Sequence, residues 1–123
     1  MSRLLQIKHR REQRQRRQMA EISRRMTQTE VMREQCQQRR SQVLQLLSQI
    51  LNWSGTLSAR ELMEQKQKMG RLFHEEIDLA RQQRVLSDQK AELQKQRDEL
   101  HCELSVTLKK VEKLRSLLND EYD

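Results

Sequence analysis

Leucine recurs every seven residues through the second half of the chain, at Leu72, Leu79, Leu86, Leu93 and Leu100. With the positions three or four residues away, these leucines keep an alternating spacing over about eight heptads, which is typical of a left-handed coiled coil. One amphipathic helix packed on a globular core needs a broader apolar face. The pattern therefore predicts long helices that meet along a narrow seam.

Composition excludes most other folds. Of 123 residues none is proline, two are glycine, and aromatic residues make up 2%. Because proline and glycine mark the turns of β-sandwiches, barrels and doubly wound α/β domains, the sequence argues against these folds. The apolar fraction, 34%, is low for a compact globule with an enclosed active site. We therefore expect a protein that is not an enzyme.

One segment, residues 52–58, interrupts the helical pattern. Gly55 can adopt a positive φ angle there. Ser58 is followed three residues later by Glu61, which is the capping-box pattern of a helix start. We predict a single domain with a basic N-terminal helix over 1–52, a turn over 53–58 and a second helix over 59–120. A short break favours an antiparallel arrangement, so the predicted fold is all-α: two long helices forming an antiparallel coiled-coil hairpin.

Charge suggests a register for this hairpin. Pairing residue i with about residue 110 minus i lets Arg39 and Arg40 face Glu75 and Glu76, and lets the arginine-rich residues 10–17 face acidic residues between 92 and 103. Roughly the last 12–15 residues of the second helix then overhang. The predicted seam comprises Met19, Ile22, Met26, Val43, Leu47, Ile50, Leu62, Met69, Leu72, Leu79, Leu86, Leu93, Leu100, Leu104 and Val111. Its polar positions include Glu76, Gln83, Lys90 and Arg97.

Positive charge is concentrated at the start of the chain. Residues 1–40 contain 12 Lys/Arg and 4 Asp/Glu, a net charge of +8, whereas residues 41–123 contain 13 and 14, a net charge of −1. A basic segment of this kind indicates an acidic partner: nucleic acid, an anionic membrane or an acidic protein surface. The candidate docking residues at the open end of the hairpin are Arg3, Lys8, Arg10, Arg11, Arg14, Arg17, Lys109, Lys110 and Lys113.

Nucleic-acid binding by a basic coiled coil is the alternative function. In leucine-zipper transcription factors the basic helix continues directly into the zipper. Here about 50 residues and a capped break separate the two. Docking onto an acidic protein ring or cleft therefore fits the spacing better.

The sequence indicates no catalytic residues, metal site or cofactor. His9, His74 and His101 are far apart in sequence. His9 and His101 can approach each other across the hairpin, but no Cys or carboxylate side chains accompany them to complete a metal site. Cys36 falls in the seam, roughly 40 Å from Cys102 in the predicted register, so a disulfide between them is excluded. There is no glycine-rich phosphate loop.

Two aromatic residues have more than one interpretation. Trp53 in the turn either packs on Leu57 or on the end of the seam, which is the favoured interpretation, or stays exposed as a partner anchor. Phe73, like Ile77, lies beside the seam, where it either widens the seam or forms an apolar patch. The wider seam is the favoured prediction.

The chain resembles the type III secretion stalk proteins, in particular the YscO/SsaO/EscO group, whose flagellar counterpart is FliJ. The residues that carry this resemblance are 51–58, Leu62, 66–69 and 72–73. The resemblance covers the whole chain in length and architecture and is specific around the turn. It implies a two-helix antiparallel coiled coil similar to the central γ stalk of rotary ATPases.

The resemblance also implies a function. The paired N- and C-terminal ends would enter the pore of a hexameric type III secretion ATPase, stimulate it and couple it to an export-gate protein. Trp53 and Leu57 are then candidate contacts for the gate at the tip. The expected partners are the ATPase, the export gate and secretion chaperones, without nucleic acid and with only indirect membrane association. The expected location is cytoplasmic, peripheral to the inner-membrane apparatus, with a role in virulence.

Overall fold

The computed structural model describes residues 2–53 and 55–122. Two α-helices, α1 (Ser2–Leu51) and α2 (Ala59–Tyr122), follow one another along the chain. The two helices pack against each other, and the described residues contain no β-strand. This arrangement confirms the prediction of an all-α, two-helix hairpin.

Hydrogen bonds mark both helix ends beside the connection. At the end of α1, the backbone N–H of Asn52 donates to the carbonyl of Ser48 at 2.9 Å. At the start of α2, the Ser58 hydroxyl accepts from the backbone N–H of Glu61 at 3.2 Å. Because a hydroxyl satisfies one of the free N–H groups of the first turn, Ser58 is the N-cap that the Ser-x-x-Glu pattern predicts.

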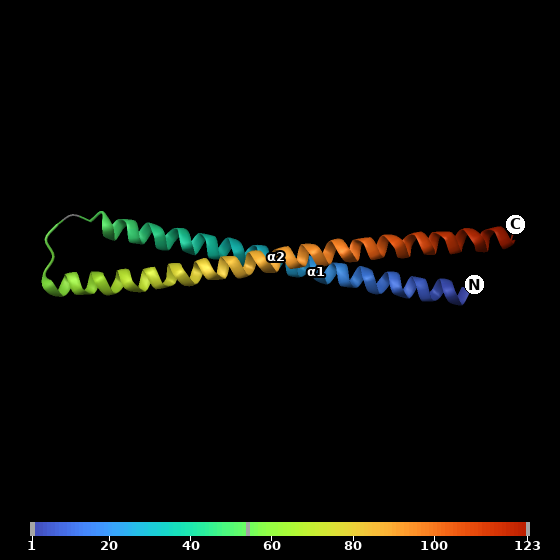
Figure 1. Cartoon of the computed structure of the whole chain (residues 1–123), viewed down its shortest axis with the longest axis horizontal. Helices are drawn as coiled ribbons and strands as arrows, with labels where there is room; N and C mark the ends of the chain where they lie inside the picture. Colours follow the sequence, from blue (N-terminus) through green and yellow to red (C-terminus); the bar gives the residue numbers. More distant parts are fainter. Residues whose placement is uncertain (1, 54, 123) are drawn as a thin grey trace. The chain divides into compact units, whose positions relative to one another are not determined.

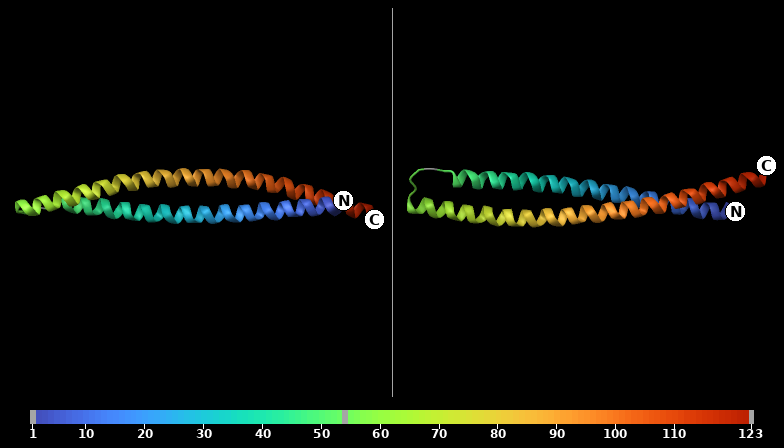
Figure 2. Two further views of the ribbon diagram at one scale, coloured as in Figure 1. Left: turned by 90° about the horizontal axis from the view of Figure 1, so that it is seen from below. Right: turned by 45° about the horizontal axis from the view of Figure 1, so that its top comes forward.

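The helices are best described in two halves. The turn half comprises residues 29–53 and 55–89, and the open half comprises residues 2–28 and 90–122. Within each half, a segment of α1 lies alongside a segment of α2 that runs in the opposite direction (Figures 1 and 2). Each half therefore has its own stretch of seam.

In the turn half, apolar side chains from both helices form one buried cluster. Val43 is fully buried at its centre. The Cys36 thiol lies in the same cluster and donates a hydrogen bond to the carbonyl of Leu79, at 3.3 Å. The buried members of the cluster are Cys36, Val43, Leu47, Leu72, Leu79 and Leu86, and Leu46 and Ile50 pack against it.

In the open half, α2 contributes most of the buried apolar surface. Its buried residues are Leu93, Leu100, Leu104, Thr107 and Val111. On the α1 side, Gln15 is buried, whereas Met19, Ile22 and Met26 are only half-buried. The seam of the open half is therefore more polar on α1 than on α2.

Two ion pairs across the turn half fix its register. Arg39 Nη2 donates to Glu75 Oε2 at 2.9 Å, and Arg40 Nε donates to Glu76 Oε1 at 2.6 Å. Both pairings were predicted from the charge pattern and are confirmed. The numbers of facing residues, such as 39 and 75 or 40 and 76, sum to about 115 instead of the predicted 110.

This shift explains where the predicted seam and overhang are wrong. Leu62 is 47% exposed because its facing position on α1 would lie beyond Leu51, where the helix has ended. Independently of the shift, Arg97, a predicted polar seam position, is exposed, and the neighbouring Gln96 is half-buried in its place. The overhang is also shorter than predicted, because Leu118 is still half-buried.

Truncating a seam leucine is expected to destabilise the protein strongly. Leu79→Ala removes buried methyl groups from the cluster, and we expect the free energy of unfolding to fall by about 2–4 kcal/mol. Val85→Ala, at an exposed position of the same helix, is the control and should change it by less than about 0.5 kcal/mol. Urea denaturation followed by circular dichroism measures the free energy of unfolding of both variants. Equal effects of the two substitutions would contradict the burial of Leu79 in the seam.

The Arg39–Glu75 pair predicts a pH dependence of stability. The hydrogen bond from Arg39 holds the pKa of Glu75 below its ordinary value. The pair therefore stabilises the fold above the ordinary carboxyl pKa, and its contribution is lost as the pH falls through the lowered pKa. Glu75→Gln should lower the Tm slightly at neutral pH, and this difference from wild type should vanish in acid. Asp88→Asn, at another exposed carboxylate of α2, is the control, and a Tm difference for Glu75→Gln that persists in acid would refute the assignment.

Candidate partner-binding surfaces

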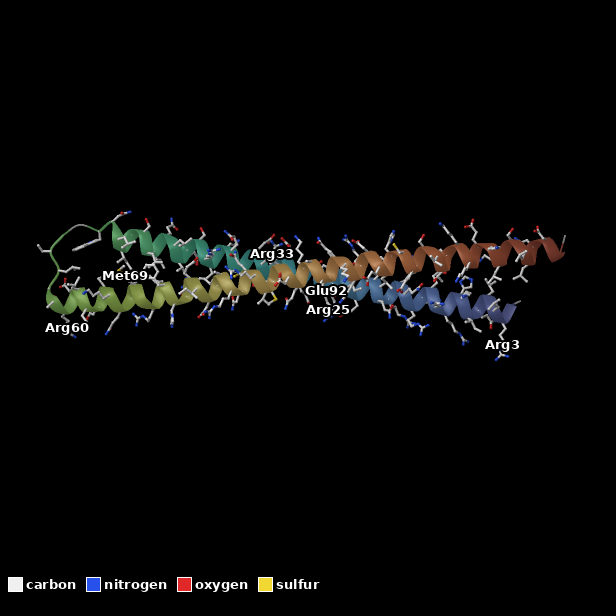
Figure 3. The ribbon with its side chains drawn as sticks, in the orientation of Figure 1. Arg3, Arg25, Arg33, Arg60, Met69 and Glu92 are labelled. Atoms are coloured by element: carbon white, nitrogen blue, oxygen red, sulfur yellow. The ribbon has the colours of Figure 1, made fainter. Side chains whose placement is uncertain are left out.

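An arginine stripe, defined as Arg3, Arg10, Arg14 and Arg17, runs along α1 in the open half. Spacings of three, four and seven residues place these side chains on one face of the helix. All four are exposed, and none forms an ion pair with a side chain that the structure describes. Figure 3 shows Arg3 pointing away from α2. The stripe therefore presents uncompensated positive charge to the surroundings.

The surface around the stripe is slightly hollowed. Arg10, Arg11, Arg14 and Arg17 line a shallow depression together with Ile7, which is exposed. Arg16 behaves differently, because its Nε donates to Glu12 of the same helix at 3.0 Å. Four arginines around one exposed apolar side chain can surround an acidic, partly apolar segment of another protein.

The other candidate docking cations differ in exposure. Lys8 is half-buried, so its side chain is less accessible to a partner than those of the stripe. On α2, the exposed side chains of Lys109, Lys110 and Lys113 carry the remaining positive charge of the open half. None of these three forms an ion pair with a described side chain.

The predicted pairing of residues 10–17 with acids of α2 is only partly realised. Arg14 and Arg17 share a groove with Glu99 and Glu103. No ion pair joins these four side chains in the described structure. The stripe therefore stays free although carboxylates lie nearby.

His9 links the two helices of the open half. Its Nε2 atom lies 3.0 Å from Nη2 of Arg115, and its Nδ1 atom lies 3.5 Å from Glu12. The structure pairs His9 with Arg115 and not, as the predicted register allowed, with His101. Because a guanidinium group has no acceptor, His9 Nε2 accepts in the contact with Arg115.

The segment between the two helices contains an exposed tryptophan whose ring packs closely against a glycine. Trp53 is 53% exposed, and its ring lies so close to Gly55 that a Cβ atom there would be 2.7 Å from the ring atom Cη2. Neither glycine has a positive φ. Gly55 is therefore required for its missing side chain and not, as predicted, for its φ angle. Leu57 is half-buried.

The sequence analysis favoured the wrong role for two residues beside the seam. Phe73 and Ile77 are each 48% exposed, so they do not widen the seam. Leu44, also exposed, follows the seam residue Val43 as Phe73 follows Leu72. In an antiparallel pair such positions lie on the same side. We call Leu44, Phe73 and Ile77 the turn-half apolar surface.

The described part of the chain contains neither a candidate metal site nor a candidate membrane-spanning helix. Among residues 2–53 and 55–122, no three His, Cys, Asp or Glu side chains are grouped so that they could hold a metal ion. No helix of this part is both long and apolar enough to cross a membrane. Cys36 and Cys102 are free thiols.

Two packed helices with exposed charged and apolar surfaces define an all-helical hairpin protein. The family model of the secretion system apparatus protein SsaO matches residues 1–123. The chain therefore belongs to the SsaO family. Members of this family are components of a type III secretion apparatus, and the family is not a known enzyme family. Comparisons with curated proteins and with solved structures gave no match. The family confirms the resemblance seen in the sequence.

The two glycines should respond in opposite ways to a methyl group. Gly55→Ala forces the Trp53 ring to move, so the emission of this single tryptophan should shift to longer wavelength. Gly70→Ala is the matched change, because nothing lies within 4 Å of a Cβ atom there. It should leave the emission unchanged and stabilise α2 by about 0.5–1 kcal/mol. Unchanged emission in Gly55→Ala would contradict the packing of the ring.

Proposed function

We propose that this chain is the central stalk of a type III secretion system. Its open half docks in the pore of the hexameric secretion ATPase and stimulates hydrolysis, and its turn half contacts the export-gate protein. Membership of the apparatus family supports this proposal. The observation that carries it is the arginine stripe, with four exposed guanidinium groups that have no partner among the described side chains.

Guanidinium groups suit a moving contact inside a ring. Each binds a carboxylate through two parallel hydrogen bonds, and such charged hydrogen bonds contribute about 1.5–3 kcal/mol each when they are shielded from water. Four groups spread along one face of α1 can engage the acidic residues of one subunit and then of the next. Successive contacts of this kind bias which subunit closes on its nucleotide.

The dimensions of the open half are compatible with a ring pore. Two packed α-helices are about 20 Å across, and their interaxial distance is about 8–10 Å. The half-polar seam, with Gln15 and Thr107 buried, contributes less hydrophobic stabilisation than a seam of leucines. A ring that encloses the open half would add stability by binding the folded form.

The turn half offers a different chemistry to the export gate. Trp53 and Leu57 at the connection, together with the turn-half apolar surface, expose apolar side chains without a neighbouring arginine stripe. Contacts with the gate would be dominated by apolar burial and those with the ATPase by charge. The chain would then be associated with the inner membrane only through the gate, and secretion chaperones are further candidate partners.

Charge reversal of the stripe tests the docking. The stripe variant combines Arg10→Glu and Arg14→Glu with Arg11→Glu, which lines the same depression. It should raise the concentration needed for half-maximal ATPase stimulation by about tenfold or more. The matched control is Lys66→Glu, Lys68→Glu and Arg71→Glu, which changes the net charge equally at exposed positions of the turn half.

The control variant should stimulate the ATPase like wild type. Stimulation that is unaffected in the stripe variant, with circular dichroism unchanged, would refute docking through the stripe. Recovery of nucleic acid with the pure protein, abolished by salt and by the stripe variant, would favour the nucleic-acid alternative.

A further inference from the structure

A second surface of the turn half forms a groove between the helices. Its floor contains Cys36, Leu79 and Leu86, which are all buried in the seam. Its volume is about 540 Å³, enough to accept a bulky apolar side chain. We call this depression the Cys36 groove.

The groove has a physical cause in the sequence. Cys36 is the smallest member of the buried cluster, where Val43 and Leu47 follow it along α1. Its sulfur is held at the floor by the hydrogen bond to the Leu79 carbonyl. Because no longer side chain fills the space above it, the surface stays hollow at this position.

The walls of the groove are apolar and open to water. Met32 of α1 is 54% exposed and Val85 of α2 is 53% exposed. Methionine adapts its shape to different apolar partners, which is why it is frequent at helix-binding surfaces. Exposed apolar walls above an apolar floor favour the burial of a side chain from another molecule.

The rim of the groove carries one uncompensated positive charge. Arg39 and Arg81 lie among its lining residues, and no Asp or Glu of the described chain does. Arg39 is compensated by Glu75, but Arg81 forms no ion pair with a described side chain. The other rim residues include the neutral amides of Gln35, Gln82 and Gln89.

We propose that the Cys36 groove docks an amphipathic helix of a partner protein, whose apolar anchor is flanked by Asp or Glu. A groove between two helices receives a third helix by the packing that coiled coils use. The basic rim selects acidic flanks and disfavours basic ones by like-charge repulsion. This inference is independent of the ATPase docking, because no residue of the arginine stripe lines the groove.

Site-specific photo-crosslinking in secreting bacteria tests the proposal. The full-length chain carries a photoreactive phenylalanine analogue at Val85, and a matched variant carries it at Leu44, which is similarly exposed but belongs to the turn-half apolar surface. We expect an adduct at Val85 in which the cross-linked partner peptide is helical, with an apolar residue and Asp or Glu three or four residues away. That peptide should be absent from the adducts of the Leu44 variant.

A charge-reversed variant makes the test specific. Arg81→Glu in the Val85 background should lower the adduct yield by about tenfold, because the rim then repels the acidic flanks. ATPase stimulation by both variants should stay at the wild-type level, which separates failure of this inference from failure of the stalk proposal. The inference is overturned by no adduct, by a basic cross-linked peptide, by a second copy of this chain as the partner, or by a yield that Arg81→Glu leaves unchanged.

Discussion

The fold depends on burial of one narrow row of side chains between two helices. Leu72, Leu79 and Leu86 of α2 meet Val43 and Cys36 of α1. Because a pair of helices buries only this row, the other faces of α1 and α2 remain in contact with water, including apolar side chains such as Phe73 and Ile77. The surfaces that can bind partners are therefore a direct consequence of a seam this narrow.

Polar residues in the seam specify which residues face each other more than they add stability. Arg40 binds both Glu76 and Gln83, and a one-residue slip of either helix would break these contacts. A buried polar atom without a hydrogen-bond partner lowers the stability of the fold. Gln15 Oε1 and Glu76 Oε2 are buried and have no hydrogen-bond partner among the described residues. Polar groups at coiled-coil seams commonly fix register at the expense of stability.

Local signals in the sequence predicted most of the fold. The heptad leucines predicted the helices and the buried positions, and the Ser58–Glu61 pattern predicted the start of α2. The register was less accurate, since exposed ion pairs are individually weak and several alignments satisfy them about equally well. Leu62 was consequently misplaced in the seam.

The candidate surfaces were harder to predict because a residue belongs to such a surface only when the opposite helix leaves its side chain uncovered. Phe73 beside a leucine seam has the same local sequence whether it is buried or exposed, and only the position of α1 decides. The packing of Trp53 on Gly55 is likewise absent from any pattern of spacing.

The distribution of charge within the open half argues for an external partner. Glu99 and Glu103 share a groove with Arg14 and Arg17, so compensation within the molecule is geometrically close. An arginine that is paired internally must lose that partner before it binds another carboxylate, which lowers the net gain. Arg39 and Arg40, beside the seam of the turn half, are paired and contribute to register. The stripe arginines are exposed and form no ion pair with described side chains, so their charge is available for a carboxylate-bearing surface.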